Sequence, residues 1–227
     1  MQHTQGIPSG KCREMAARVA MILLSLCICG AASAELRIRV TQANGKPLPG
    51  AVVTVHALDP AVPAAAPIKA VMDQIDLAFA PDVLVIPAGS TVSFPNSDKV
   101  GHEVYSFSSA HPFKLGLYRG TPRDPQLFDR PGLVTLGCNI HDAMLAYILV
   151  TDAAYYGFTA ADGTWTQPEL PRGKYRIEVW SPRLQEPGQL LQREVVVTGE
   201  HVAAEIRSDH ALRPPQLQKR PHSWDAY

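Results

Sequence analysis

Residues 137–144 have the sequence Gly137-Cys-Asn-Ile-His-Asp-Ala-Met144. The segment follows the pattern C-x-x-H-x-x-M, so a thiol, an imidazole and a thioether lie close together along the chain. The β-rich run Leu133–Leu136 precedes it, and the nearly all-apolar run Met144–Val150 follows it. Runs of this length and composition predict strands. We therefore expect a loop between two strands that brings three metal-ligating side chains to one place.

Composition narrows the possible classes of protein. The chain has 227 residues, of which 46% are hydrophobic, with 21 basic and 21 acidic side chains. The apolar content excludes a disordered chain. A formal net charge of zero argues against a nucleic-acid-binding or polybasic membrane-surface protein, because either would carry a basic excess. The length allows one large domain or two small ones.

The first 34 residues have the features of a secretory signal peptide. A basic segment at residues 11–18 precedes an apolar run at residues 19–29, and small residues then lead to Ala32-Ser33-Ala34. The apolar run is shorter than the roughly 18 residues of a membrane span, and A-x-A is a typical cleavage site. We expect cleavage after Ala34 and export to the periplasm, with an uncleaved anchor as the alternative.

Cleavage at this point changes the cysteine count and the charge. The signal peptide contains three of the four cysteines, so the exported chain holds only Cys138. A single thiol forms no internal disulfide, so Cys138 is either a buried, inert side chain or a functional one. The exported chain has 18 basic and 20 acidic side chains, and its methionines are Met72 and Met144.

A second histidine occupies a related position upstream. His102 follows the turn-rich stretch Phe94-Pro-Asn-Ser-Asp-Lys-Val-Gly101, between two predicted strands. One thiolate, two imidazoles and one thioether form the ligand set of a blue copper site. Thiolate and thioether suit Cu(I) and imidazoles suit Cu(II), so a trigonal His₂Cys plane with a weak axial sulfur tolerates both oxidation states. Copper is therefore the cofactor that these residue types favour.

The whole exported chain has the pattern of a β protein. From residue 35 to about residue 207, short runs rich in β-branched and aromatic residues alternate with turns rich in Gly, Pro, Asn and Asp. The pattern predicts an all-β chain with one or two antiparallel β-sandwiches. Residues 59–67 are rich in Pro and Ala and are expected to form a linker, and the polar residues 208–227 are expected to form a flexible tail.

The stretch from about Met72 to Thr151 resembles a cupredoxin of the plastocyanin and amicyanin type. Its Cys-loop spacing matches the short amicyanin version, and Phe94-Pro-Asn…His102-Glu-Val is similar to cupredoxin-like proteins labelled methylamine-utilisation proteins. The resemblance implies a Greek-key β-sandwich. It also implies that one type 1 copper ion is bound by four residues, which are His102, Cys138, His141 and Met144.

The same resemblance implies a function. A cupredoxin is a single-electron carrier rather than an enzyme, and its partners would be redox proteins such as a c-type cytochrome or a periplasmic dehydrogenase. Electrons would leave through the exposed edge of His141. Two positions depart from the usual pattern: Glu103 stands where many cupredoxins have an Asn that ties the ligand loops together, and Gly137 stands where an aromatic residue is common. Asn139 and Asn96 are candidates to replace the lost loop contact.

The flanks resemble the two halves of a different sandwich. Asn44-Gly-Lys-Pro-Leu-Pro-Gly-Ala-Val-Val-Thr-Val55 is similar to the opening of a carboxypeptidase-regulatory-like (transthyretin-like) domain, and Leu170-Pro-Arg-Gly-Lys-Tyr-Arg-Ile-Glu-Val-Trp180 to its closing strand. We therefore expect residues 35–67 and 152–207 to form one small sandwich. The cupredoxin of residues 68–151 would be inserted into it or packed directly against it.

Other interpretations remain open at this stage. The protein could store or deliver copper without a redox partner, or its copper motif could be vestigial in an interaction protein. A Cys–His hydrolase is more distant, because no orienting residue or oxyanion hole accompanies the thiol. His111 is a candidate for an alternative ligand, and Asp98 and Asp142 are expected to cap turns or loops.

Overall fold

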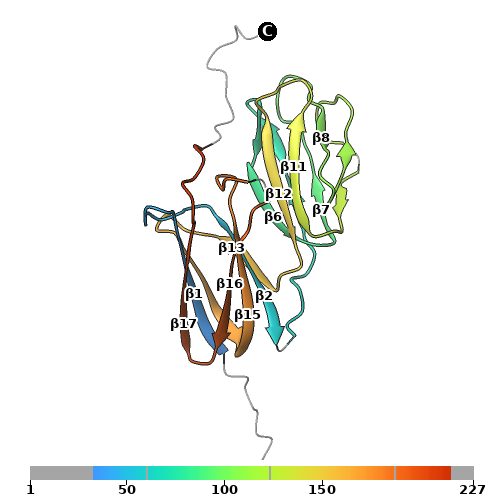
Figure 1. The fold of residues 1–227 in the computed structure, drawn as a ribbon. Coiled ribbons are helices and arrows are strands. Elements are labelled where there is room, and N and C mark those ends of the chain that lie inside the picture. Colours follow the sequence, from blue (N-terminus) through green and yellow to red (C-terminus); the bar gives the residue numbers. More distant parts are fainter. Residues whose placement is uncertain (1–32, 60, 123, 187, 216–227) are drawn as a thin grey trace, which may run out of the picture. The chain divides into compact units, whose positions relative to one another are not determined.

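The computed structural model describes residues 33–59, 61–122, 124–186 and 188–215 (Figure 1). All regular elements in these residues are β-strands, which confirms the all-β prediction. In the same residues no helix has the length and apolarity needed to cross a membrane. Most of the predicted signal peptide lies outside the described residues, but Ser33 and Ala34 form the start of strand β1 (Ser33–Thr41).

The central part of the chain forms a sandwich of two sheets with a small hairpin. One sheet has the strand order β6 (Val83–Pro87), β12 (Leu145–Thr151), β11 (Gly132–Cys138), β8 (Val104–Ser106) and β9 (Phe113–Lys114). The other has the order β10 (Gln126–Phe128), β7 (Ser90–Ser93) and β3 (Lys69–Val71). The hairpin pairs β4 (Asp73–Ile75) with β5 (Ala78–Ala80). One hydrophobic core takes side chains from both sheets, so they are the two layers of one sandwich.

Strand β12 is buried on both faces, which explains why the run after Met144 is apolar throughout. Its alternate residues Ala146 and Ile148 lie in the core between the two sheets. The intervening residues Tyr147 and Leu149 pack in a second apolar cluster around Trp180, a residue of the flanking sandwich. The ring centroids of Tyr147 and Trp180 are 5.3 Å apart. Because successive side chains of a strand point to opposite faces, a strand covered on both sides needs apolar residues throughout.

The flanking segments form a second sandwich. Its first sheet has the order β14 (Thr164–Pro171), β1 and β17 (His201–Arg207), and its second has the order β13 (Tyr155–Phe158), β2 (Val52–Asp59), β15 (Gly173–Trp180) and β16 (Leu191–Val197). Strand β1 pairs in parallel with β17 and antiparallel with β14. Strands from both ends of the described chain therefore share sheets. In chain order the central sandwich is inserted between β2 and β13, as Figure 1 shows by colour.

Residues 61–68 and 208–215, in the segments predicted to be irregular, contain no strand, but both segments make ordered contacts. The amide of Ala65 donates a hydrogen bond to the carbonyl of Ala153 at 3.0 Å. After β17, Ser208 is buried and Leu212 packs against the core of the second sandwich. The amide of Arg213 donates to the carbonyl of Arg183 at 2.8 Å, so hydrogen bonding extends at least to this residue. Residues 216–227 of the predicted tail lie outside the described residues.

Candidate metal centre

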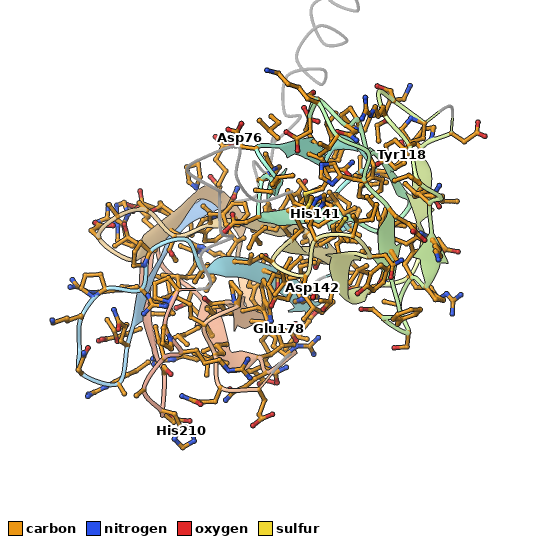
Figure 2. All side chains as sticks on the ribbon, turned by 90° about the horizontal axis from the view of Figure 1, so that it is seen from above. Asp76, Tyr118, His141, Asp142, Glu178 and His210 are labelled. Atoms are coloured by element: carbon orange, nitrogen blue, oxygen red, sulfur yellow. The ribbon has the colours of Figure 1, made fainter. Side chains whose placement is uncertain are left out.

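Three of the four predicted ligands come from two neighbouring strands and the loops at their ends. Cys138 is the last residue of β11 and pairs with Val104 of β8. His102 precedes β8, and a bridge to Tyr118 holds its backbone, with His102 N–H to Tyr118 O at 3.1 Å and the reverse bond at 3.0 Å. His141 lies in the connection from β11 to β12, beside Asp142 (Figure 2). The pairing of β11 with β8 therefore brings residues far apart in the sequence together.

The donor atoms of these three residues converge. Nδ1 of His102 and Nδ1 of His141 are 3.1 Å apart, and Sγ of Cys138 lies 3.7 Å from the first nitrogen and 3.8 Å from the second. His102 and Cys138 are buried, whereas His141 is half-buried. Among the described residues, this is the group of His, Cys, Asp and Glu side chains that could hold a metal ion.

The spacing fits a trigonal metal site. Two donors at about 2.0 to 2.3 Å from one ion, roughly 120° apart, are separated by about 3.5 to 3.7 Å. The observed separations of 3.1, 3.7 and 3.8 Å are close to these values. The donor set therefore suits a thiophilic cation such as copper.

Met144 lies at the other end of the His141 turn. The amide of Met144 donates to the carbonyl of His141 at 3.0 Å, which closes a turn over residues 141–144. The Met144 side chain is 2% exposed and belongs to the same core cluster as Cys138. Its role as the fourth, axial ligand stays a prediction.

The surroundings favour ionisation of the thiol. Burial alone raises the pKa of Cys138, but the hydrogen bond with His102, the backbone amides of Glu103 and Ile140, and His141 together lower this pKa to about 6. Burial likewise acts to lower the pKa of His102, yet its hydrogen bonds with Cys138 and Asp98 outweigh burial and raise it. A Cys thiol normally has a pKa of about 8.5. Cys138 is therefore a thiolate at neutral pH, the form that binds metals.

Asn139 and Glu103 tie together the loops that hold His102 and His141. The amide of Asn139 donates to the carbonyl of Glu103 at 3.1 Å, and its side-chain amide donates to Glu103 Oε2 at 3.2 Å. Glu103 Oε1 also pairs with Lys114. Of the two candidates, Asn139 therefore connects the loops of His102 and His141. Asn96 instead holds its own loop through the carbonyl of Val100 and joins it to the segment after β9 through the carbonyl of Tyr118, both at 2.9 Å.

The glycine before Cys138 has a steric explanation. Gly137 pairs directly with Tyr105 across β11 and β8. A Cβ atom added to Gly137 would lie 2.8 Å from both Cζ and the hydroxyl of Tyr105. The aromatic side chain at this place therefore comes from the neighbouring strand, and an aromatic residue at position 137 would displace it.

Asp98 and Tyr118 contact the site but were not assigned to it from the sequence. Asp98 caps a turn, as expected, and its Oδ2 also lies 2.8 Å from Nε2 of His102. The hydroxyl of Tyr118 donates to Phe94 O at 2.8 Å and accepts from Gln74 at 2.6 Å. Burial raises the pKa of Tyr118 to about 12, so its hydroxyl stays neutral.

His111 lies apart from the converging group. Its ring packs against Phe128 and Phe113, with centroid separations of 4.3 and 5.1 Å. Burial lowers the pKa of His111. The structure places this side chain in an aromatic cluster, so it does not replace His102 in the group of three donors.

No family model and no curated protein matches the chain. Among solved structures, it is similar to a purple cupredoxin from Nitrosopumilus maritimus, with 21% identity over 36% of this chain and 99% of that chain and a TM-score of 0.33. A mutant fern plastocyanin has 19% identity over 37% of this chain and 99% of its own, with a TM-score of 0.31. A copper-containing nitrite reductase from Thermus scotoductus SA-01 has 23% identity over 49% of this chain and 28% of its own, with a TM-score of 0.34. At these identities and TM-scores the likeness assigns no ligand, partner or reaction. The fold and the donor atoms define the chain as an all-β protein with a candidate His–Cys–His metal centre.

Proposed function

We propose that the protein is a periplasmic type 1 copper protein that carries single electrons between redox partners. The observation that carries the proposal is the convergence of Sγ of Cys138 with Nδ1 of His102 and of His141, at separations of 3.1 to 3.8 Å. Bound copper would supply reversible one-electron exchange between Cu(II) and Cu(I). His102, Cys138, His141 and Met144 would hold the ion.

The choice of copper rests on the donor set. A structural zinc site is normally closed by four Cys or His ligands, whereas the described residues offer three such donors here. A thioether is a poor donor for zinc and a good one for Cu(I). The buried Met144 beside His141 therefore favours copper over zinc.

The protein frame suits electron transfer because it fixes the donors before metal binds. His102 is held by its backbone bridge to Tyr118, Cys138 by the sheet, and Asn139 ties the two loops. Donors that stay in place in both oxidation states keep the cost of reorganisation low. Because His102 is buried and His141 is half-buried, the edge of His141 is the proposed exit for the electron.

The partners and location are part of the proposal. The signal-like first 34 residues support export, and the proposed partners are a c-type cytochrome or a periplasmic dehydrogenase. The described residues of the flanking sandwich show no cluster of metal-ligating side chains. We assign that sandwich the role of a scaffold or docking surface, and we place no catalytic residue in either sandwich.

Addition of Cu(II) to the purified protein tests the proposal. We expect an intense blue thiolate-to-copper absorption band at one copper per chain, and its loss and return on reduction and reoxidation. Cys138→Ser removes the band, whereas the control His201→Ala, at an exposed position in β17, keeps it. Tight Cu(I) binding without the band would instead support a storage or delivery protein. Absence of stoichiometric copper binding would contradict both the electron-carrier and the storage function. The remaining interpretation would then be an interaction protein with a vestigial copper motif.

A further inference from the structure

Asp98 contacts the most deeply buried of the three donor side chains. Its Oδ2 lies 2.8 Å from Nε2 of His102. The His102 side chain is 0% exposed and that of Asp98 is 12% exposed, so water hardly reaches the bond. An ionised carboxylate only accepts hydrogen bonds, so Nε2 must carry the hydrogen that it donates. Nδ1 of His102 is then the nitrogen left to bind a metal ion, and this is the atom that faces Cys138 and His141.

The carboxylate of Asp98 is itself held by a neighbouring turn. The amide of Asp76 donates to Oδ1 at 2.7 Å, and the amide of Leu77 donates to Oδ2 at 3.0 Å. These two residues connect β4 to β5. From the other side, the amide of Asp98 donates to Oδ1 of Asn96 at 2.9 Å. Together with the bond from His102, the oxygens of the carboxylate therefore accept three hydrogen bonds, and these fix its position.

The turn adopts an unusual backbone conformation to provide these donors. Asp76 has φ of 52° and Leu77 has φ of 57°, both in the left-handed region. That region is uncommon for residues other than glycine, and a bulky side chain makes it more costly. Strained conformations persist where surrounding contacts over-determine them, often near functional groups. Both amides of this turn point at one carboxylate, and that carboxylate contacts His102.

We propose that Asp98 is a positioning residue that tunes the copper site and that the turn at Asp76–Leu77 holds it in place. The inference rests on the proposed copper function and adds to it a determinant of the reduction potential. A carboxylate that accepts from the distal nitrogen of a ligand histidine fixes the ring and raises the basicity of the ligating nitrogen. Its negative charge also stabilises Cu(II) more than Cu(I). Asp98 therefore lowers the reduction potential.

Asp98→Asn tests this effect because it removes the charge and keeps a hydrogen-bond acceptor of the same shape. Loss of such a partner typically lowers metal affinity about 10- to 100-fold. We expect the loss to fall mainly on Cu(II). A tenfold loss of Cu(II) affinity relative to Cu(I) corresponds to a rise of about 59 mV in reduction potential. The measurements are the potential, by redox titration, and the affinities for both ions, by competition with chelators.

Asp142→Asn is the matched control. Asp142 directly follows His141 in the connection between β11 and β12, so its substitution removes the same charge close to the site. Its side chain is exposed, and water and salt screen an exposed charge. We expect Asp142→Asn to change the potential much less than Asp98→Asn. Equal shifts in the two variants, or no shift in Asp98→Asn, would overturn the assignment and reduce Asp98 to a cap for its loop.

The turn is tested with two substitutions of one residue. Leu77→Gly keeps the amide donor and permits positive φ, so it leaves the potential unchanged. Leu77→Pro removes the donor and forces a negative φ, so the potential rises as in Asp98→Asn. In the double variant with Asp98→Asn, Leu77→Pro adds no further rise. An additive rise would show that the turn acts independently of Asp98. If Leu77→Pro does not fold, Asp98→Asn and its control still decide the main point.

A measurement without metal separates this inference from the copper proposal. In the metal-free chain, ¹⁵N NMR should find the hydrogen of His102 on Nε2 in slow exchange with water, and Asp98→Ala should remove this protection. No blue copper band in the wild-type protein would overturn both proposals. A band in the wild type, together with an unchanged potential in Asp98→Asn, would overturn only the role of Asp98.

Discussion

The ring of Tyr105 covers Gly137 from the neighbouring strand. The two residues form a direct pair between β8 and β11, and Cys138 follows Gly137. Tyr105 also lies against Phe107, with ring centroids 5.0 Å apart, and Phe107 is 84% exposed. Gly137 is therefore required by a cross-strand neighbour rather than by its own backbone conformation.

This contact predicts that Gly137→Ala destabilises the protein by about 1 to 3 kcal/mol, because the added methyl group overpacks against Tyr105. Urea unfolding would measure the loss. In the Tyr105→Ala background the same substitution should cost less, since the obstructing ring is absent. A double-mutant cycle gives the coupling directly. Equal costs in the two backgrounds would contradict the steric explanation.

Thr159 connects the two halves of the flanking sandwich. Its hydroxyl donates to the carbonyl of Leu48 at 2.6 Å and accepts from the amide of Ala51 at 3.0 Å, and the side chain is buried. Thr159→Val leaves two buried polar groups without partners. We expect a loss of roughly 2 to 4 kcal/mol in the free energy of unfolding. Thr166→Val, at an exposed position of β14, is the control and should stay within about 0.5 kcal/mol of the wild type.

The pKa of Cys138 predicts an unusual titration. The metal-free thiol should ionise with a midpoint near pH 6, instead of the about 8.5 of a free thiol. Its pKa lies below the usual value, so the thiolate predominates above the midpoint and is lost as the pH falls through it. The difference in ultraviolet absorbance between the wild type and Cys138→Ser isolates this group. His102→Asn should move the midpoint upward, and a midpoint that stays near 6 would show that His102 is not responsible.

Met144 gives a prediction for the axial position. Met144→Gln replaces the thioether with a harder oxygen donor, which favours Cu(II). We therefore expect the blue band to shift and the reduction potential to fall, opposite to the rise expected for Asp98→Asn. Met144→Leu conserves the volume and should cost less than about 1.5 kcal/mol in the metal-free protein. If Met144→Gln keeps the wild-type spectrum and potential, Met144 is a packing residue and not a ligand.

Local spacing made much of the candidate site predictable from the sequence. Cys138 and His141 are three residues apart in one loop, so any pairing of the flanking strands keeps them close. His102 lies 36 residues before Cys138. Its assignment came from the donor set and the resemblance, because spacing alone does not show that β8 pairs with β11. The alternation of short β-rich runs also predicted the all-β fold.

Contacts that depend on register and loop geometry could not be predicted. Asp98 is four residues before His102, but outside a helix that spacing says nothing about which way a carboxylate points. The contact between Tyr105 and Gly137 requires the register of β8 on β11. The parallel pairing of β1 with β17 joins strands separated by most of the described chain. The sequence indicated a turn near Asp98. Only the packing of the β4–β5 hairpin against this turn holds the Asp98 carboxylate next to His102.

The insertion fixes an order in which the protein can be completed as it is synthesised. Strands β3 to β12 form one continuous segment, so the central sandwich has all its strands before β13 emerges. The first sheet of the flanking sandwich stays unfinished until β17 reaches β1. Contacts between such distant segments form late, because closing a long loop costs entropy. A chain that stops before Arg207 would thus leave an open edge on β1 and a target for proteases, while the central sandwich is already assembled.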